Sequence, residues 1–463
     1  MAVLRYSRQA ATPKGFIRRL EDMKLDSILD PRQLSKVRFP LPAVLSAIIL
    51  GVATGALSMR AVECRTEQAK EPVRQATGIH ERIADNTLGT LLPRLDPLRL
   101  RLALHSMVKA ELRRENLAPL DFPFHVVAFD GKCLTTVTYQ TMRRLAMNHY
   151  RKYCRDNGLD LDDFVTVEQV ESYIRTWQPD VQWCASADGR SHWGLVRVHR
   201  ATLVSSSAAL CVDQMTIPGK TNETGAIITN LSKWYEAYRW TQFKDAVVTL
   251  DAGNTSAEVG AWLGDRCLGY FLALKSIHGN IHGHAVELLD VDHRTPDLRL
   301  SITEKGNDIT YKVWQMPLLS GYGAWPSARQ VVCIERLSVG DEPESASVGR
   351  RYFISNKPVS ELRVHDALKL CRLHWRCENE GHWSSDVMFG EDRGRAVGTT
   401  DPRGMVVLSL LRQLAQNLLA LLRSLSRHDV AEGKPSWRAV MEHGLAALFD
   451  PVIDPERFEL CDS

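Results

Sequence analysis

The sequence predicts an α/β protein whose mixed sheet is flanked by helices and preceded by a helical region. Residues 1–118 place apolar side chains at helical spacing and show no strand-like alternation. Short β-branched runs then alternate with helical stretches, and residues 406–425 form a long apolar helix. A chain of 463 residues exceeds one compact core. We therefore expect a helical domain (1–118), an α/β domain (119–425) and a tail (426–463).

The helical region contains one segment that resembles a membrane span. Residues 39–59 carry no charge, and this length reaches the roughly 17–25 residues of a transmembrane helix. Two prolines, two glycines and the lack of a second such segment favour a buried helix. Further helices are expected over residues 87–94 and 98–114.

Strands and helices alternate through the α/β region. A β-rich run ends at Asp130, and a second ends at Asp251. Strands are expected at 124–129, 194–199, 201–204, 208–214, 245–250, 269–274, 298–302, 308–314 and 329–334. Helices are expected over much of 139–178, at 224–238 and 256–263, and from residue 360.

Charge and cysteine content limit the classes of function. The net charge is only +3, but Arg5, Arg8, Lys14, Arg18 and Arg19 all precede the first acidic residue, which is compatible with a polyanionic partner. Ten cysteines occur without a CxxC pair, which argues against a zinc ribbon or a thioredoxin-like site. No signal peptide is recognisable, so we expect reduced thiols and a cytoplasmic location, with the nucleoid as the site of any DNA binding.

Three carboxylates are candidates for metal-dependent chemistry. Asp130 and Asp251 each follow an apolar strand, and ligand sites of α/β sheets form at such strand ends. Glu378 lies in a helical segment, and about 120 residues separate each of the three from the next. Carboxylates gathered together would repel one another unless cations lay between them, and Mg²⁺ and Mn²⁺ prefer such oxygens. For any single one of them, a helix cap or solvated loop is the commoner role.

The order of the motifs resembles that of DDE transposases of bacterial insertion sequences, in the branch that includes the H-repeat-associated proteins. The matching segments are Asp30-Pro31-Arg32, Asp130-Gly131-Lys132, Lys220-Thr221-Asn222-Glu223, Thr249-Leu250-Asp251-Ala252, Tyr270 through Lys275, Arg351 through Ser355, and His374 through Asp392. The last is the most specific, since every fixed position of its H-W-x-x-E-N-x-x-H-W-x-x-D-V-x-F-x-E-D pattern is present. The chain departs from the family in a longer insertion at 134–190, in the loop after Lys275 and near residue 305.

This resemblance implies a ribonuclease-H-like core with insertions at about 134–190 and 276–350. It also implies that Asp130, Asp251 and Glu378 hold two divalent ions, Mg²⁺ or Mn²⁺, about 4 Å apart, which promote phosphodiester chemistry. The enzyme would cut one strand of double-stranded DNA at an element end and join the freed 3′-hydroxyl to target DNA. A homodimer is expected because two ends must be paired.

Neighbouring residues receive subsidiary roles. We expect Lys132, Lys220, Lys275, His374, Trp375 and Arg376 to contact DNA, and Asn379, His382, Trp383 and Asp386 to support the site. An ordinary surface lysine is an equal alternative for each lysine. For the two tryptophans, packing of the Glu378 helix onto the sheet is preferred over base stacking. The basic residues of 139–153 either bind DNA or form an ordinary solvent-exposed helix face.

Two other functions use the same residues. A catalytically idle relative could persist as a DNA-binding protein, although its triad would be expected to decay, and here it is intact. A nuclease on the same fold would cut DNA without joining it.

Overall fold

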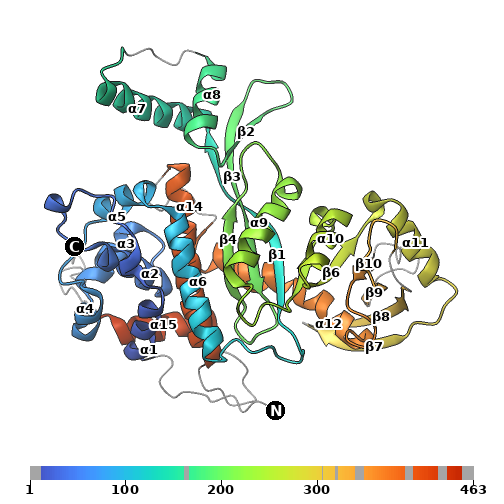
Figure 1. Cartoon of the computed structure of the whole chain (residues 1–463). Helices are drawn as coiled ribbons and strands as arrows, with labels where there is room; N and C mark the ends of the chain where they lie inside the picture. Colours follow the sequence, from blue (N-terminus) through green and yellow to red (C-terminus); the bar gives the residue numbers. More distant parts are fainter. Residues whose placement is uncertain are drawn as a thin grey trace, which may run out of the picture.

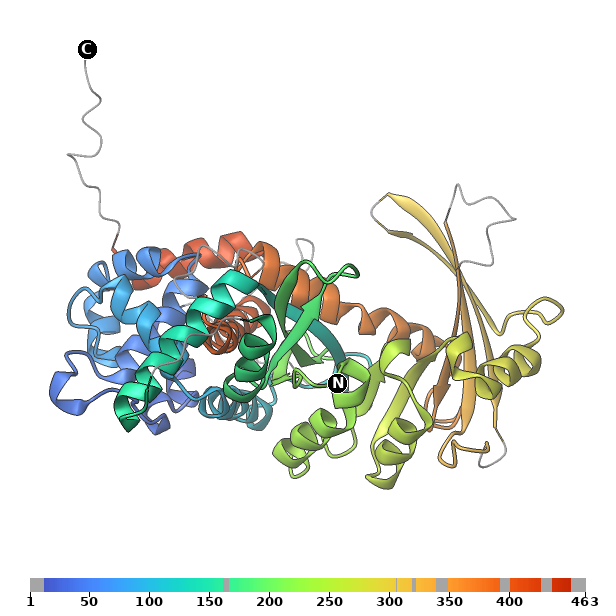
Figure 2. The same cartoon turned by 90° about the horizontal axis from the view of Figure 1, so that it is seen from above.

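The computed structural model describes residues 12–160, 166–304, 306–318, 322–338, 349–391, 400–425 and 435–450. Its centre is a ten-stranded mixed sheet with helices around it. Seen from above, the amino-terminal helices, the central strands and the strands β7–β10 follow one another along the long axis of the molecule (Figure 2). The predicted α/β class with a mixed sheet is therefore confirmed.

Six helices form the amino-terminal part: α1 (Pro13–Asp22), α2 (Leu41–Ala53), α3 (Met59–Glu67), α4 (Glu71–Thr77), α5 (Asp85–Leu91) and α6 (Pro97–Arg113). Thr12, Ser58 and Asp96 cap three of them by accepting backbone N–H groups of the first turn. In α2 every residue except Pro42 is buried inside the protein. The uncharged segment is thus a core helix, as expected.

The central strands are β1 (Val126–Thr138), β3 (His192–Leu203), β4 (Leu210–Thr216), β5 (Val247–Leu250) and β6 (Gly269–Leu274). β3 pairs antiparallel with both β1 and β4, whereas β5 pairs parallel with both β1 and β6 (Figure 1). The helices α9 (Glu223–Tyr238) and α10 (Ala257–Asp265) precede β5 and β6. This order places β1 between β3 and β5, and its first four residues, Val126–Phe129, are buried.

The prediction that the first strand ends before Asp130 is wrong. β1 continues to Thr138 because residues 131–138 keep pairing with β3, across a register shift between Cys133 and Thr135. Asp130 therefore lies within a strand. Likewise, the two strands expected at 194–199 and 201–204 are one strand, β3.

Two segments of the chain add further strands to the sheet. Between β1 and β3 lie α7 (Tyr139–Asn157), α8 (Val167–Trp177) and β2 (Val181–Ala185). After β6 come α11 (Asn280–Leu289), β7 (Leu298–Glu304), β8 (Asn307–Pro317), β9 (Gln330–Ser338) and β10 (Arg350–Ser355), which extend the sheet antiparallel from β6. β2 and α11 were not foreseen from the sequence.

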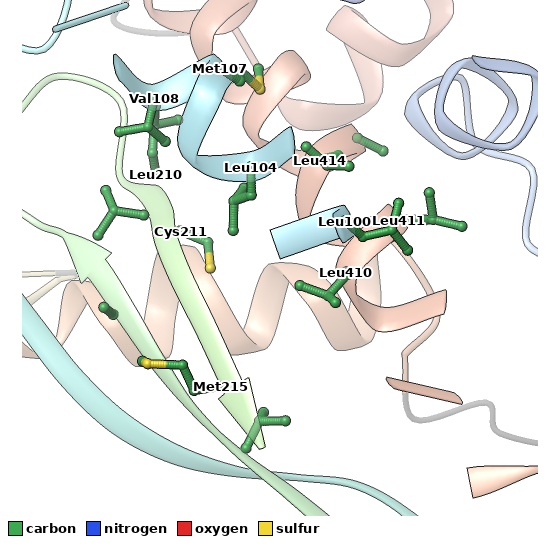
Figure 3. Close-up of a cluster of buried hydrophobic side chains, with 14 of the residues drawn as sticks. Leu100, Leu104, Met107, Val108, Leu210, Cys211, Met215, Leu410, Leu411 and Leu414 are labelled. Carbon is green, nitrogen blue, oxygen red and sulfur yellow. The ribbon is translucent and has the colours of Figure 1, made fainter. Parts of the chain in front are cut away.

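Helix α14 (Pro402–Leu425) joins the amino-terminal helices to the sheet. It packs against α2, α6 and β4, and Leu410, Leu411 and Leu414 meet Leu104 from α6 (Figure 3). Among the described residues it alone is long and apolar enough to cross a membrane, yet its apolar window is entirely buried inside the protein. One core therefore runs from the helices into the sheet.

The carboxyl-terminal region differs from the expected tail. It contains the helix α15 (Trp437–Leu448), which Ser436 caps and which packs on α14 and α1. The helices at the two ends of the described chain thus share one core.

Candidate active site

Asp130 and Asp251 lie next to each other where β5 ends beside β1. Phe129 of β1 pairs with Leu250, the last residue of β5, so the residue after each of this pair is an aspartate. Asp251 caps the 3-10 turn η4 (Ala252–Asn254). Its Oδ1 accepts hydrogen bonds from the backbone N–H of Asn254 at 3.1 Å and from the Asn254 side-chain amide at 2.9 Å. These bonds fix one oxygen of the second carboxylate.

Glu378 approaches the same strands from a later segment. Helix α12 (Val364–His374) is followed by the π-helix η7 (Cys377–His382), which contacts β1 and β3. π-Helical turns are rare and occur often at functional sites. The Glu378 side chain is exposed, whereas Cys377 beside it is buried. The turn therefore presents the carboxylate to solvent near the two aspartates.

The three carboxylates act on one another electrostatically. Burial, followed by the charges of Asp251 and Glu378, raises the pKa of Asp130 to about 7, and Glu223 adds to this effect. Yet no group of three or more His, Cys, Asp or Glu side chains in the described part of the chain is gathered closely enough to hold a metal ion. The arrangement concentrates negative charge without forming a closed coordination shell.

A fourth carboxylate, which sequence reasoning did not assign to the site, lies beside Asp130. Glu223 begins α9, which Asn222 caps by accepting the Gly225 N–H at 2.8 Å. A Cβ placed on Gly131 would lie 2.3 Å from the Glu223 carboxyl carbon, so the absence of a side chain there makes room for the Glu223 carboxylate. The available signals were the glycine after Asp130 and the position of Glu223 directly after a capping asparagine.

His374 and His382, each of which is followed by a tryptophan in the His374–Asp392 signature, face the protein interior. His374 Nδ1 lies 2.9 Å from the Thr249 hydroxyl, and burial lowers the pKa of His374 to about 4. His382 Nδ1 lies 3.4 Å from Asp130 Oδ2, and burial lowers the pKa of His382 to about 3. Both imidazoles are thus neutral at pH 7. For His374 this corrects the expectation of a DNA contact, since the ring is engaged with β5.

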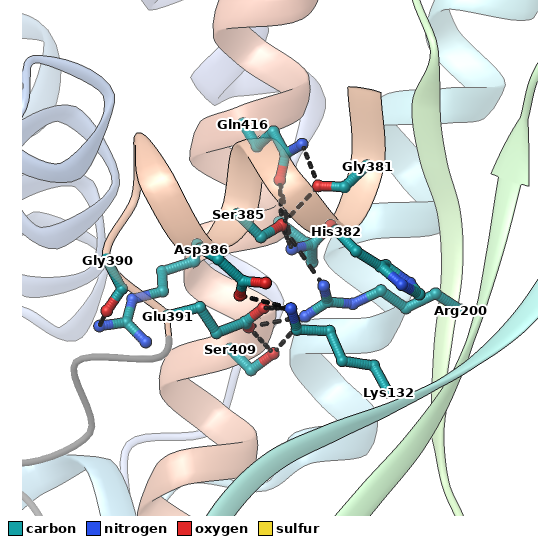
Figure 4. A network of polar contacts seen from close by, with 12 residues as sticks. Lys132, Arg200, Gly381, His382, Ser385, Asp386, Gly390, Glu391, Ser409 and Gln416 are labelled. Atoms are coloured by element: carbon teal, nitrogen blue, oxygen red, sulfur yellow. Dashed lines mark hydrogen bonds and ion pairs between the residues drawn. The ribbon is translucent and has the colours of Figure 1, made fainter. Parts of the chain in front are cut away.

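Lys132 also differs from its expected role. Its side chain is buried, and its ammonium pairs with Asp386 and lies 3.5 Å from Glu391 (Figure 4). Arg200 of β3 donates to the same Glu391 at 2.6 Å. Opposite charges in a buried network hold the ammonium away from solvent, so it faces the protein interior rather than a phosphate.

Arg376 is likewise engaged inside the protein. Its guanidinium donates to the carbonyl oxygens of Val204 and Ser206 and forms an ion pair with Glu380 at 2.7 Å. The expected DNA contact is therefore replaced by bonds that hold η7 against the end of β3. The carboxylate Asp392 of the same signature lies outside the described residues, as do Arg5 and Arg8.

Five further residues with predicted roles are exposed. They are Lys220, Lys275, Asn379, Trp375 and Trp383. Trp375 and Trp383 are 40% and 54% exposed, so part of each side chain is accessible and part is covered by the protein. The guanidinium of Arg351 lies 4.4 Å from the centre of the Trp375 ring.

Comparison with known proteins gives one distant relative. The chain is 23% identical over 304 residues to "Putative transposase YncI" of Escherichia coli O157:H7, covering 57% of this chain and 72% of that protein. This chain is similar to a transposase. No family model matches it. A cryo-EM structure of a piggyBac transposase synaptic complex with hairpin DNA aligns with 96% of this chain and 78% of that chain, at 10% identity; its TM-score of 0.40 supports no conclusion.

Proposed function

We propose that this protein is a DDE transposase that cleaves DNA at the ends of an insertion sequence and transfers the strand to target DNA. The observation that carries the proposal is the pair formed by Asp130 in β1 and Asp251 directly after the parallel strand β5, with Glu378 and Glu223 near enough to raise the pKa of Asp130. The similarity to a transposase-related E. coli protein supports the reaction class.

We further propose a ribonuclease-H-like core. It is supported by the strand sequence β4-β3-β1-β5-β6, in which the first three strands are antiparallel and the last two run parallel to β1. The carboxyl-terminal ends of β5 and the middle of β1 meet at the aspartates, where side chains from α9 and η7 also arrive. On this proposal, α7–β2 and α11–β9 are insertions.

The donor set fits divalent cations. Asp130, Asp251 and Glu378 offer hard oxygen ligands, and the raised pKa of Asp130 reflects negative charge that a cation would neutralise. Bound Mg²⁺ or Mn²⁺ would supply charge neutralisation at the attacking and leaving oxygens of the phosphodiester. Small movements of the side chains are required, because no closed shell exists among the described residues.

The chain's own residues would orient this site. Asn254 donates two hydrogen bonds to Oδ1 of Asp251, which leaves Oδ2 available to a cation on this proposal. The neutral His382 ring beside Asp130 and the neutral His374 ring on Thr249 position η7 without adding positive charge. Exposed Trp375 and Trp383 flank Glu378 and would meet DNA that approaches it.

The test is a reaction of the full chain with Mg²⁺ and DNA that carries the ends of its own element. We expect strand-transfer products that disappear in Asp251→Asn, while Asp265→Asn, an exposed aspartate on α10, retains them. Cleavage without joining would indicate a nuclease, and binding without cleavage would indicate a catalytically idle relative. Either result overturns the proposal.

A further inference from the structure

Helix α7 has two contrasting faces. Met142, Ala146, Met147 and Cys154 are buried and hold the helix against α8, β1 and β3. Arg144, Arg151 and Arg155 are exposed. At 100° per residue these three arginines lie within about 40° of one another on one side of the helix, opposite Met142 and Ala146. We call the surface formed by Arg144, Arg151 and Arg155 the arginine stripe.

The arginine stripe is unusual for a solvated helix face. Such faces commonly alternate charge so that residues four apart attract each other. In α7 Arg151 and Arg155 are like charges four apart, and no carboxylate stands three or four residues from Arg144. The helix carries five basic residues and one acidic residue, Asp156. The face that holds the stripe therefore presents positive charge along the helix with no acidic residue of α7 between the arginines.

The position of the stripe matches a long ligand. Eleven residues separate its ends, which is about 16 Å at 1.5 Å per residue. This length corresponds to roughly five base pairs of duplex DNA. α7 and α8 project beyond the end of the sheet, directly after the strand that carries Asp130 (Figure 1). Thr138, the last residue of β1, follows Asp130 by eight residues, or about 26 Å of extended chain.

We propose that the arginine stripe binds the phosphate backbone of duplex DNA outside the active site. The inference rests on the proposed function and adds a second, sequence-independent contact beyond the end of β1. Phosphate contacts position a protein on a duplex without reading its sequence. The spacing of the arginines along one face, and not the net charge of the chain, carries this assignment.

The test compares two triple variants with equal loss of charge. Arg144→Gln/Arg151→Gln/Arg155→Gln removes the stripe, and glutamine retains a high helix propensity. Lys24→Gln/Lys244→Gln/Arg438→Gln removes three exposed charges scattered elsewhere. Binding to a mixed-sequence duplex several helical turns long is measured by fluorescence anisotropy over a series of KCl concentrations. Circular dichroism verifies that both variants fold.

The slope of log affinity against log salt should fall by about 2 to 3 in the stripe variant, since each phosphate contact contributes about 0.9. The scattered variant should keep the wild-type slope. Equal slopes in all three proteins, or an equal fall in both variants, would overturn the inference. Asp251→Asn should abolish cleavage and keep the wild-type slope, so failure of the proposed chemistry is recorded separately from failure of the stripe.

Discussion

Asp130 is the residue at which burial and neighbouring charge act in the same direction. Three carboxylates, Asp251, Glu378 and Glu223, and the surrounding protein all disfavour its ionised form. Proteins tolerate such conflicts where a site needs them and lose stability in exchange. Gly131 contributes to the conflict, because the space above it admits the Glu223 carboxylate.

Asp130→Asn should therefore stabilise the ion-free protein at neutral pH by about 2 °C or more in unfolding midpoint. The folded-state pKa of about 7 exceeds the ordinary value of 3.8, so wild-type stability falls as pH rises from about 4 through 7. The increase in unfolding midpoint that Asp130→Asn brings should thus be small at pH 4 and reach its full size above pH 7. Thermal unfolding across this range measures it.

Mg²⁺ should raise the unfolding midpoint of the wild-type protein. It should leave the midpoint of Asp130→Asn unchanged, because only the intact set of carboxylates binds the ion. Asp265→Asn, with an exposed side chain, should respond to Mg²⁺ as the wild type does. An undiminished Mg²⁺ response in Asp130→Asn would contradict the metal assignment.

Gly131→Ala should lower the rate of DNA cleavage about tenfold or more, equivalent to about 1.4 kcal/mol of barrier. The added methyl would lie 2.3–2.7 Å from the atoms of the Glu223 carboxylate, which must then move away from Asp130. Gly283→Ala is the matched control, because its Cβ would meet nothing within 4 Å. Single-turnover cleavage assays compare the two, and equal rates would refute a role for this close approach.

At the scale of elements, α6 is fastened to β4 by a buried charge cluster. Asp213 of β4 accepts two hydrogen bonds of 2.6 Å from Arg101 and lies 3.0 Å from His105 Nε2. Burial alone would raise the pKa of Asp213, but His105 and Arg101 outweigh it and lower the pKa to about 2. The helices are thereby joined to the sheet by charge as well as by apolar packing.

Asp213→Asn should destabilise the protein by about 3–5 kcal/mol at pH 7, because it leaves a buried guanidinium without its partner. The native pKa lies below the ordinary value of 3.8, so the contribution exists above pH 4 and is lost as the pH falls towards 2. Denaturant unfolding at several pH values should show that the difference in free energy of unfolding between the wild type and Asp213→Asn becomes smaller below pH 4. A gap independent of pH would exclude an electrostatic origin.

At the scale of the whole molecule, α14 is shared by the helical region and the sheet. It contacts α2, α6 and β4, and its leucines lie in one buried cluster with side chains of α6 and β4 (Figure 3). The helices at the beginning of the described chain and α15 at its end both depend on this one helix. The two regions are therefore expected to unfold together.

Leu414→Ala should cost about 2–5 kcal/mol, since Leu414 is fully buried. Because α14 serves both regions, hydrogen exchange should accelerate in α2 and in β3 to a similar extent. Leu102→Ala, at a side chain that is 51% exposed, should change neither the free energy of unfolding nor the hydrogen exchange of α2 and β3. Faster exchange confined to α2 would show that the helical region unfolds independently.

The sequence by itself determined the class of the fold and the candidates for chemistry. Apolar periodicity located α2, α6, α14, β5 and β6, because helix and strand periods are local properties of the chain. The aspartate after β5 and the ordered motifs around Glu378 were equally visible. Each of these features depends on residues close to one another in sequence.

Only the tertiary structure decided how those residues are used. β1 passes beyond Asp130 because β3 continues to pair with it, and Lys132 is withdrawn into the protein because Asp386 and Glu391 reach it from far along the chain. Trp375 and Trp383, which lie just before and just after η7, stay partly exposed. Glu223 joins the site because Gly131 leaves space for it. Such outcomes depend on partners distant in sequence, whose approach no local pattern encodes.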